Sequence, residues 1–172
     1  MGKKSRRKPA IDNTEGSFPV VGIGASAGGL EALKAFFGAT PSGAGIAYIV
    51  VVHLHPDQPS MMPELLARIA SIPVSVAADG DVVQPDHAYV TPPNHEITIE
   101  NDTLHLTEHE EGIHLSIDSF FRSLAAARGN NCAVVVLSGS GTDGTVGAKA
   151  IKQRDGLVLV QSSESAKHVG MP

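Results

Sequence analysis

Apolar residues in this chain follow two alternating patterns, short continuous runs and segments with helical spacing. Continuous runs are typical of strands buried on both faces of a parallel sheet. Segments whose apolar residues recur every three or four positions are typical of amphipathic helices. The runs predict strands at 18–25, 45–53, 72–77, 87–93, 132–139 and 157–161, and the spaced segments predict helices at 28–38, 59–71, 116–129 and 145–156.

Residues 96–107 behave differently, because apolar and polar positions alternate there around Asn101-Asp102. That pattern predicts an antiparallel hairpin. Elsewhere strands and helices alternate, which favours an α/β fold. We therefore expect a three-layer, mostly parallel, doubly wound sheet with the hairpin as an insertion. Only a loop ending in "GMP" follows the strand at 157–161, so we expect the domain of residues 18–172 to be truncated at its C-terminus.

Composition places the chain among ordinary globular proteins, with 42% hydrophobic and 18% charged residues. We expect that the protein is not an integral membrane protein, since no apolar run approaches the length of a membrane span. Cys132 is the one cysteine, so no internal disulfide can form. It opens an apolar run, which predicts a buried, inert thiol. A single cysteine is compatible with a reducing compartment, and we expect a cytoplasmic protein.

Charge is distributed unevenly along the chain. The segment Lys3–Lys8 holds five of the 13 basic residues. The rest of the chain has only eight basic residues against 18 acidic ones. Residues 1–17 are polar, and we expect a disordered basic leader there. The acidic remainder argues against a nucleic-acid-binding domain.

Polar side chains stand at the ends of three predicted strands. Ser26 follows the first, His53 ends the second, and Asp143 lies in the "SGSGTDG" loop after the long run at 132–139. Sites in open parallel sheets form outside the carboxyl ends of the strands. A serine, a histidine and an aspartate there are the components of a catalytic triad.

The loop around Ser26 allows three interpretations. Gly22, Gly24 and Gly28 approximate a dinucleotide-binding motif with one residue too many, and His53 occupies the place of the acidic residue that would bind ribose. The string Gly24–Gly28 also satisfies G-x-S-x-G, the nucleophile elbow, although the chain order of Ser26, His53 and Asp143 is not that of the α/β-hydrolases. A Gly-rich turn without chemistry is the third interpretation.

Other histidines compete with His53. His55 is its nearest rival, although its place two residues further on favours a loop position. A metal site would need ligands such as His95, His109 and His114, or His53 with His55. Their spacing matches no familiar site and no cysteines support it, so we expect no metal.

Taken together, these motifs resemble the catalytic domain of the chemotaxis protein-glutamate methylesterases. The strings that carry the resemblance are "GIGASAGG", "VHLHPD", "HAYVTPPN", "LSGSGTDG" and the closing "GMP". The resemblance runs from Phe18 to Pro172. Val52 is a departure, because the family commonly has glutamine there. The short leader in place of a receiver domain resembles methylesterase–methyltransferase fusion proteins, in which the methyltransferase follows.

The resemblance implies a serine hydrolase that needs no cofactor. Ser26 would be the nucleophile, His53 the base and Asp143 the third member of the triad, with oxyanion and loop support from Ala27, Ser140 and Gly141. The substrates would be methylated glutamates on the cytoplasmic helices of chemoreceptors, with deamidation of receptor glutamines as a second activity. A methyltransferase domain, fused or separate, would be a further partner.

Two rival hypotheses remain at this stage. The fold could be kept in an inactive binding or regulatory module of a signalling fusion protein, because of Val52 or the truncated end. The chain could instead be a nucleotide-binding domain. An active-serine probe would label the enzyme and neither rival.

Overall fold

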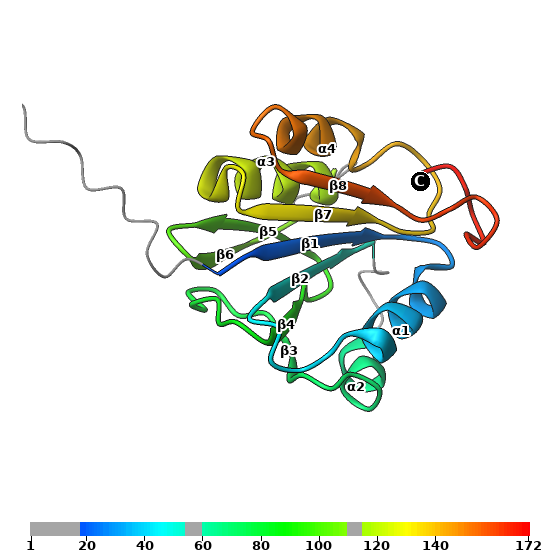
Figure 1. The fold of residues 1–172 in the computed structure, drawn as a ribbon, viewed down its shortest axis with the longest axis horizontal. Coiled ribbons are helices and arrows are strands. Elements are labelled where there is room, and N and C mark those ends of the chain that lie inside the picture. The colour runs from blue at the N-terminus through cyan, green and yellow to red at the C-terminus, as the bar shows by residue number, and fades with distance from the viewer. Residues whose placement is uncertain (1–17, 54–59, 110–114) are drawn as a thin grey trace, which may run out of the picture.

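The computed structural model describes residues 18–53, 60–109 and 115–172, so the predicted leader lies outside the described residues. Its main sheet has six strands, all parallel, in the order β3-β4-β2-β1-β7-β8 (Figure 1). These strands are β1 (Val20–Ala25), β2 (Ala47–Val52), β3 (Val74–Val76), β4 (His87–Val90), β7 (Cys132–Val136) and β8 (Leu157–Val160). The chain starts in the middle at β1, builds one side through β2, and then crosses to β7 and β8 on the other. The predicted doubly wound parallel sheet is confirmed.

The alternating segment forms the predicted hairpin. Strands β5 (His95–Glu100) and β6 (Thr103–Glu108) pair antiparallel and make a separate small sheet. Asn101 and Asp102 join them with φ of 46° and 64°. A tight hairpin turn of this kind needs positive φ at both central residues, and asparagine and aspartate tolerate it better than other side chains.

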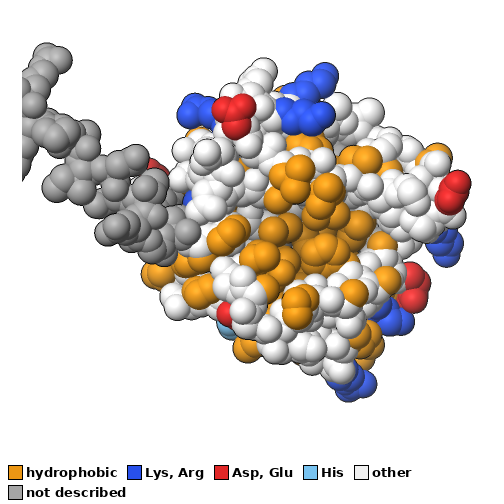
Figure 2. Space-filling view, in the orientation of Figure 1, with side chains coloured by type: hydrophobic (Ala, Val, Ile, Leu, Met, Phe, Trp, Pro, Cys, Tyr) orange, Lys and Arg blue, Asp and Glu red, His pale blue; other side chains and the backbone are white. Residues whose placement is uncertain are grey.

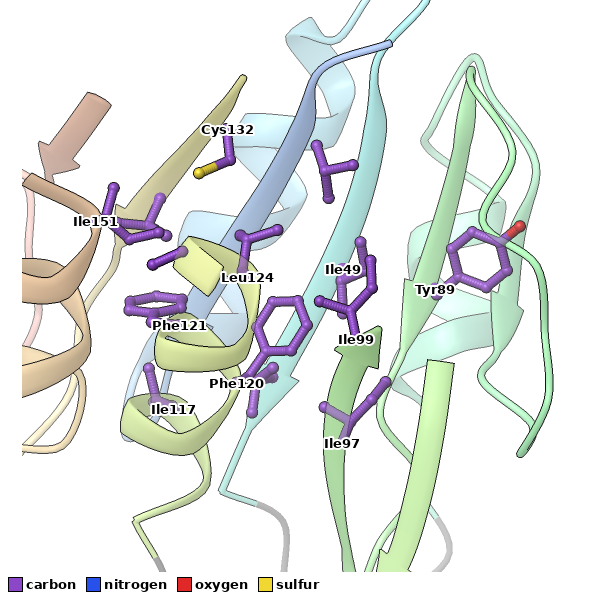
Figure 3. Packing of buried hydrophobic residues seen from close by; sticks show 14 of the residues in the cluster. Ile49, Tyr89, Ile97, Ile99, Ile117, Phe120, Phe121, Leu124, Cys132 and Ile151 are labelled. Atoms are coloured by element: carbon purple, nitrogen blue, oxygen red, sulfur yellow. The ribbon is translucent and has the colours of Figure 1, made fainter. Parts of the chain in front are cut away.

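Helices cover both faces of the main sheet, which gives the expected three layers (Figure 1). Helices α1 (Gly29–Ala39) and α2 (Met62–Ala67) enclose one core with the strands, centred on Phe37, Tyr48 and Leu66. Helices α3 (Ser116–Arg128) and α4 (Thr145–Lys152), with the hairpin, enclose the other. Figure 3 shows Phe120 and Phe121 of α3 within this second core.

Helix α3 lies very close to the central strand β1. A Cβ atom added at Gly24 would lie 2.6 Å from Cγ2 of Ile117, and one added at Gly22 would lie 2.9 Å from Cε1 of Phe120. Neither distance is possible for a real side chain. The first two glycines of the loop motif are therefore explained by helix–strand packing.

Several predicted elements are shorter in the structure. The helix expected at 59–71 spans only Met62–Ala67, and Pro59 lies outside the described residues. After Ala67 the chain runs through turns, in which the N–H groups of Ile69 and Ala70 both donate to the Leu66 carbonyl, before it enters the sheet at Val74. The Ser60 hydroxyl accepts a hydrogen bond from the Met62 N–H at 3.2 Å, just before the helix begins.

The edge strand β8 leaves apolar side chains in solvent. Leu157, Leu159 and Val160 are 57%, 49% and 59% exposed, whereas Val158 packs against the α3–α4 core. Figure 2 shows hydrophobic side chains gathered in the middle of this face of the molecule, over β8, β7 and β1. One edge of the sheet is therefore apolar and open.

The expectation for Cys132 is also met. Cys132 is buried, and that burial raises the pKa of its thiol to about 11, so the thiol is inert at neutral pH. Among the helices in the described ranges, none has the length and apolar character needed to cross a membrane.

Candidate active site

Ser26 lies in the turn that connects β1 to α1. Its backbone N–H donates to the Ser138 carbonyl at 3.0 Å, and its own carbonyl accepts from the Gly29 N–H at 2.9 Å. Gly28 has φ of 75°, a left-handed conformation that glycine adopts without strain and that lets the chain reverse sharply into the helix. This turn places a half-buried serine at the carboxyl edge of the sheet.

His53 lies beside Ser26 because their strands are neighbours in register. Ala25 pairs with Val52, and the next residue of each strand enters the site. Nδ1 of His53 lies 3.2 Å from Oγ of Ser26, and the imidazole is about one third exposed, at 34%. His55, its rival in the sequence, lies outside the described residues.

Asp143 reaches the same imidazole from the loop after β7. Its Oδ2 atom lies 2.7 Å from Nε2 of His53, and its side chain is only 4% exposed. The carboxylate also accepts the N–H of Ile117 on Oδ2 at 3.0 Å and that of Asp118 on Oδ1 at 2.8 Å. Both donors belong to the first turn of α3, so the positive end of that helix faces the aspartate.

These contacts keep Asp143 ionised. Burial by itself raises the pKa of the carboxyl, but hydrogen bonds from His53, Asp118 and Ile117 outweigh it, and the pKa lies below its ordinary value. An ionised carboxylate only accepts hydrogen bonds. The proton between Asp143 and His53 therefore belongs to Nε2, and in the neutral imidazole Nδ1 then carries a lone pair directed at the Ser26 hydroxyl.

The imidazole is turned over relative to the serine-protease arrangement, in which Nε2 faces the serine and Nδ1 faces the aspartate. Here Nδ1 faces Ser26 and Nε2 faces Asp143. The two arrangements are equivalent in proton chemistry, since one ring nitrogen accepts from the serine while the other donates to the carboxylate.

The residues expected to support an oxyanion lie in two loops. Ala27 follows Ser26 directly and is exposed, as are Ser140 and Gly141. Within the described ranges, the backbone N–H of Ala27 has no hydrogen-bond acceptor. The residue packed against Ser26 in the second loop is Gly139, whose N–H already donates to the His168 carbonyl at 3.1 Å. A role for Ser140 and Gly141 stays a prediction.

Ser138 and its partners hold these loops together and were not singled out from the sequence. The fully buried Ser138 hydroxyl donates to the Ala27 carbonyl and accepts the His168 N–H, both at 2.9 Å. Its N–H donates to Oε1 of Gln161 at 2.8 Å. Ser138 is the first residue of the "SGSGTDG" string, so the motif contained it. A serine in a Gly-rich loop, however, does not by itself indicate that its hydroxyl is buried and hydrogen-bonded.

Metal ligands do not converge in the part of the chain that the structure describes, where no group of three or more suitable side chains was found. His95 contacts the Pro93 carbonyl at 2.8 Å, and His109 contacts Oγ of Ser116 at 3.3 Å. His114 lies outside the described residues.

Fold and site together define a doubly wound α/β domain that carries a serine–histidine–aspartate constellation at the carboxyl edge of its sheet. The family model of the CheB methylesterase matches residues 21–172. The chain belongs to the CheB methylesterase family.

Relatives of known name agree with this assignment. A protein-glutamate methylesterase/protein-glutamine glutaminase of Syntrophus aciditrophicus is 33% identical over 96% of this chain and 48% of its own length. One from Pseudomonas aeruginosa is 33% identical over 89% of this chain and 45% of its own length. The chain thus spans about half the length of these relatives. The crystal structure of the Thermotoga maritima CheB methylesterase catalytic domain superposes with a TM-score of 0.82 at 25% identity, covering 91% of this chain and 86% of that one.

Proposed function

We propose that this protein is a serine hydrolase that removes methyl esters from glutamate side chains of chemoreceptors and deamidates receptor glutamines. The observation that carries the proposal is the position of the His53 imidazole, with Nδ1 3.2 Å from the Ser26 hydroxyl and Nε2 2.7 Å from the Asp143 carboxylate. Membership of the CheB methylesterase family and the names of the relatives support the choice of substrate.

In the proposed mechanism, Ser26 attacks the ester carbonyl while Nδ1 of His53 takes the hydroxyl proton. The tetrahedral oxyanion is stabilised by backbone N–H groups, of which that of Ala27 is the best placed. When the intermediate collapses, Nδ1 returns the proton to the leaving oxygen, and methanol departs from an acyl-enzyme. With glutamine as substrate the leaving group is ammonia.

Hydrolysis of the acyl-enzyme repeats these steps with water in place of Ser26. Nδ1 takes a proton from the water, which attacks the acyl carbonyl, and then returns the proton to the serine oxygen as the glutamate product leaves. Asp143 keeps the proton of the ring on Nε2 and stabilises the imidazolium that forms in each half-reaction. In this cycle Ser26 is the nucleophile, His53 accepts and returns the proton, and Asp143 orients and stabilises the ring, and no cofactor is required.

The proposed setting is the cytoplasm, where the receptor helices that carry these esters lie. A methyltransferase domain, fused or separate, would restore the methyl groups and is the proposed functional partner. Residues 18–172 form the proposed catalytic domain, and residues 1–17 the proposed basic leader.

Two measurements test the proposed function. A fluorophosphonate probe should label the protein at Ser26, and the Ser26→Ala variant should stay unlabelled. Methanol release from a methylated chemoreceptor fragment should depend on the same serine. A protein that is neither labelled nor able to release methanol would be the inactive binding module of the rival hypothesis.

A further inference from the structure

Asp118 has a buried carboxylate that the proposed mechanism does not use. It lies in the first turn of α3 and is only 6% exposed. Its Oδ1 atom accepts the backbone N–H of Gly147, with a donor–acceptor distance of 2.6 Å. Gly147 belongs to the first turn of α4, where backbone N–H groups have no partner within their own helix. Asp118 therefore satisfies a buried donor at the start of the neighbouring helix.

Asp143 likewise satisfies backbone donors at the start of a neighbouring helix, in this case α3. It precedes α4, and its carboxylate accepts the N–H groups of Ile117 and Asp118 at the start of α3. Neither helix receives a side-chain cap from its own N-cap residue. The start of each helix thus donates backbone N–H groups to a carboxylate from the start of the other helix. One of these two carboxylates, that of Asp143, also contacts His53.

Helices α3 and α4 are in close contact at Gly147, so the first turn of α4 has no space to move toward α3. A Cβ atom added at Gly147 would lie 2.4 Å from Cβ of Phe121 and 3.0 Å from the Asp118 carbonyl oxygen. Gly147 is also only four positions after Asp143. A shift in the first turn of α4 would therefore be transmitted to the loop that carries Asp143.

We propose, building on the function proposed above, that Asp118 is a positioning residue for the active site. Its carboxylate fixes the first turn of α4 against α3, and this holds Asp143 at hydrogen-bond distance from His53. Asp118 does not itself contact Ser26 or His53, and it acts only through Asp143. Removing its carboxylate leaves the Gly147 N–H without its acceptor and frees the loop of residues 143–147.

The sharpest test compares Asp118→Ala with Asp118→Asn. Both variants keep the backbone N–H that donates to Asp143, and the asparagine also keeps an oxygen that can accept from Gly147. We expect Asp118→Ala to lower kcat by about 10- to 100-fold, the range that small misplacements of reacting groups produce, with little change in KM. Asp118→Asn should recover most of the loss.

A second readout does not depend on activity. The proton on Nε2 of His53 should give a low-field NMR resonance in the resting protein, identified by its absence in His53→Ala. Asp118→Ala should shift or broaden this resonance, and Asp118→Asn should restore it. If the wild-type protein proves inactive, the proposed function fails, but this resonance still decides whether Asp118 positions Asp143.

The matched control is Asp86→Ala. The Asp86 carboxylate also accepts a backbone N–H from another segment, that of Gly45 at 3.0 Å, but it precedes β4, at the amino edge of the sheet. Asp86 has φ of 56°, so alanine should cost stability there without reaching the site. We expect kcat and the His53 resonance to stay at their wild-type values.

Two results would overturn the proposal. One is a folded Asp118→Ala protein with wild-type kcat and an unchanged His53 resonance. The other is an equal fall in kcat for Asp118→Ala and Asp86→Ala, which would reflect lost stability alone. If Asp118→Ala does not fold, Asp118→Ser replaces it, with the same expectations and the same overturning results, because the shorter hydroxyl cannot reach as far as the carboxylate.

Discussion

The Oδ2 atom of Asp143 lies 2.7 Å from Nε2 of His53, and the same oxygen accepts the N–H of Ile117 from the start of α3. The Asp143 carboxylate is thus fixed by the backbone of α3 and in turn fixes the orientation of the His53 imidazole. Because the low pKa of Asp143 keeps it ionised, this single contact determines which ring nitrogen carries the proton and leaves Nδ1 free for Ser26.

The first prediction separates the two neighbouring histidines. His53→Ala should abolish ester hydrolysis, because it removes the only base within reach of the Ser26 hydroxyl in the described site. His55→Ala should leave most of the activity. The measurement is methanol release from a methylated receptor fragment. Equal losses in the two variants would disprove the assignment of His53.

The second prediction concerns the nucleophile. Ser26→Ala should lower turnover by roughly 10⁴-fold or more, as removal of a triad member does in serine hydrolases. Thermal melting should change little, because a lone hydroxyl in a half-buried turn contributes little packing. Wild-type methanol release from the folded variant would rule out the mechanism.

The third prediction concerns pH and stability. The folded pKa of Asp143 lies below the unfolded value of about 3.9, so its stabilising contribution is complete above that pH and is lost as pH falls through the folded pKa. Wild type should therefore lose stability below about pH 4 more steeply than Asp143→Asn, which has no such group to titrate. Denaturant unfolding of both proteins between about pH 2 and pH 6 checks this. Parallel pH profiles for the two proteins would contradict the expectation.

The fourth prediction tests the close approach of α3 to β1. Gly24→Ala should destabilise the fold by about 1–3 kcal/mol, because the added methyl group overlaps Ile117. The Ile117→Ala background removes the overlapping atoms, so the cost of Gly24→Ala should be much smaller there. A double-mutant cycle of unfolding free energies measures the coupling. Strictly additive costs would show that the two positions do not compete for space.

The fifth prediction concerns the open apolar edge of the sheet. Exposed apolar edge strands favour association between copies, so the protein should self-associate as its concentration rises. The double variant Leu157→Lys, Leu159→Lys should shift it toward monomer in size-exclusion chromatography. Val146→Lys is the control, because Val146 is as exposed, at 55%, but lies on α4. An unchanged elution profile for the double variant would show that β8 does not mediate association.

Much of this arrangement is predictable from the chain alone. Strands buried in a parallel sheet are recognisable in the sequence as apolar runs, and sites in such sheets form at the carboxyl ends of the strands. Ser26, His53 and Asp143 could therefore be grouped from the sequence alone. The hairpin was predictable because Asn101-Asp102 tolerates the positive φ of its turn.

Other features depend on tertiary contacts that no local pattern records. The orientation of the His53 ring follows from the direction in which Asp143 enters the site. The acceptor role of Asp118 follows from the crossing of two helices that are separated in sequence. The purpose of Gly24 follows from the approach of Ile117, more than ninety positions away in the printed sequence. In each case the sequence shows a suitable residue but not its partner.

The three side chains of the proposed triad leave the sheet from β1, β2 and the loop after β7, and these strands are adjacent members of one parallel array. The proposed chemistry thus depends on the central strands of the domain. Peripheral segments could therefore change without displacing Ser26, His53 or Asp143 from this arrangement.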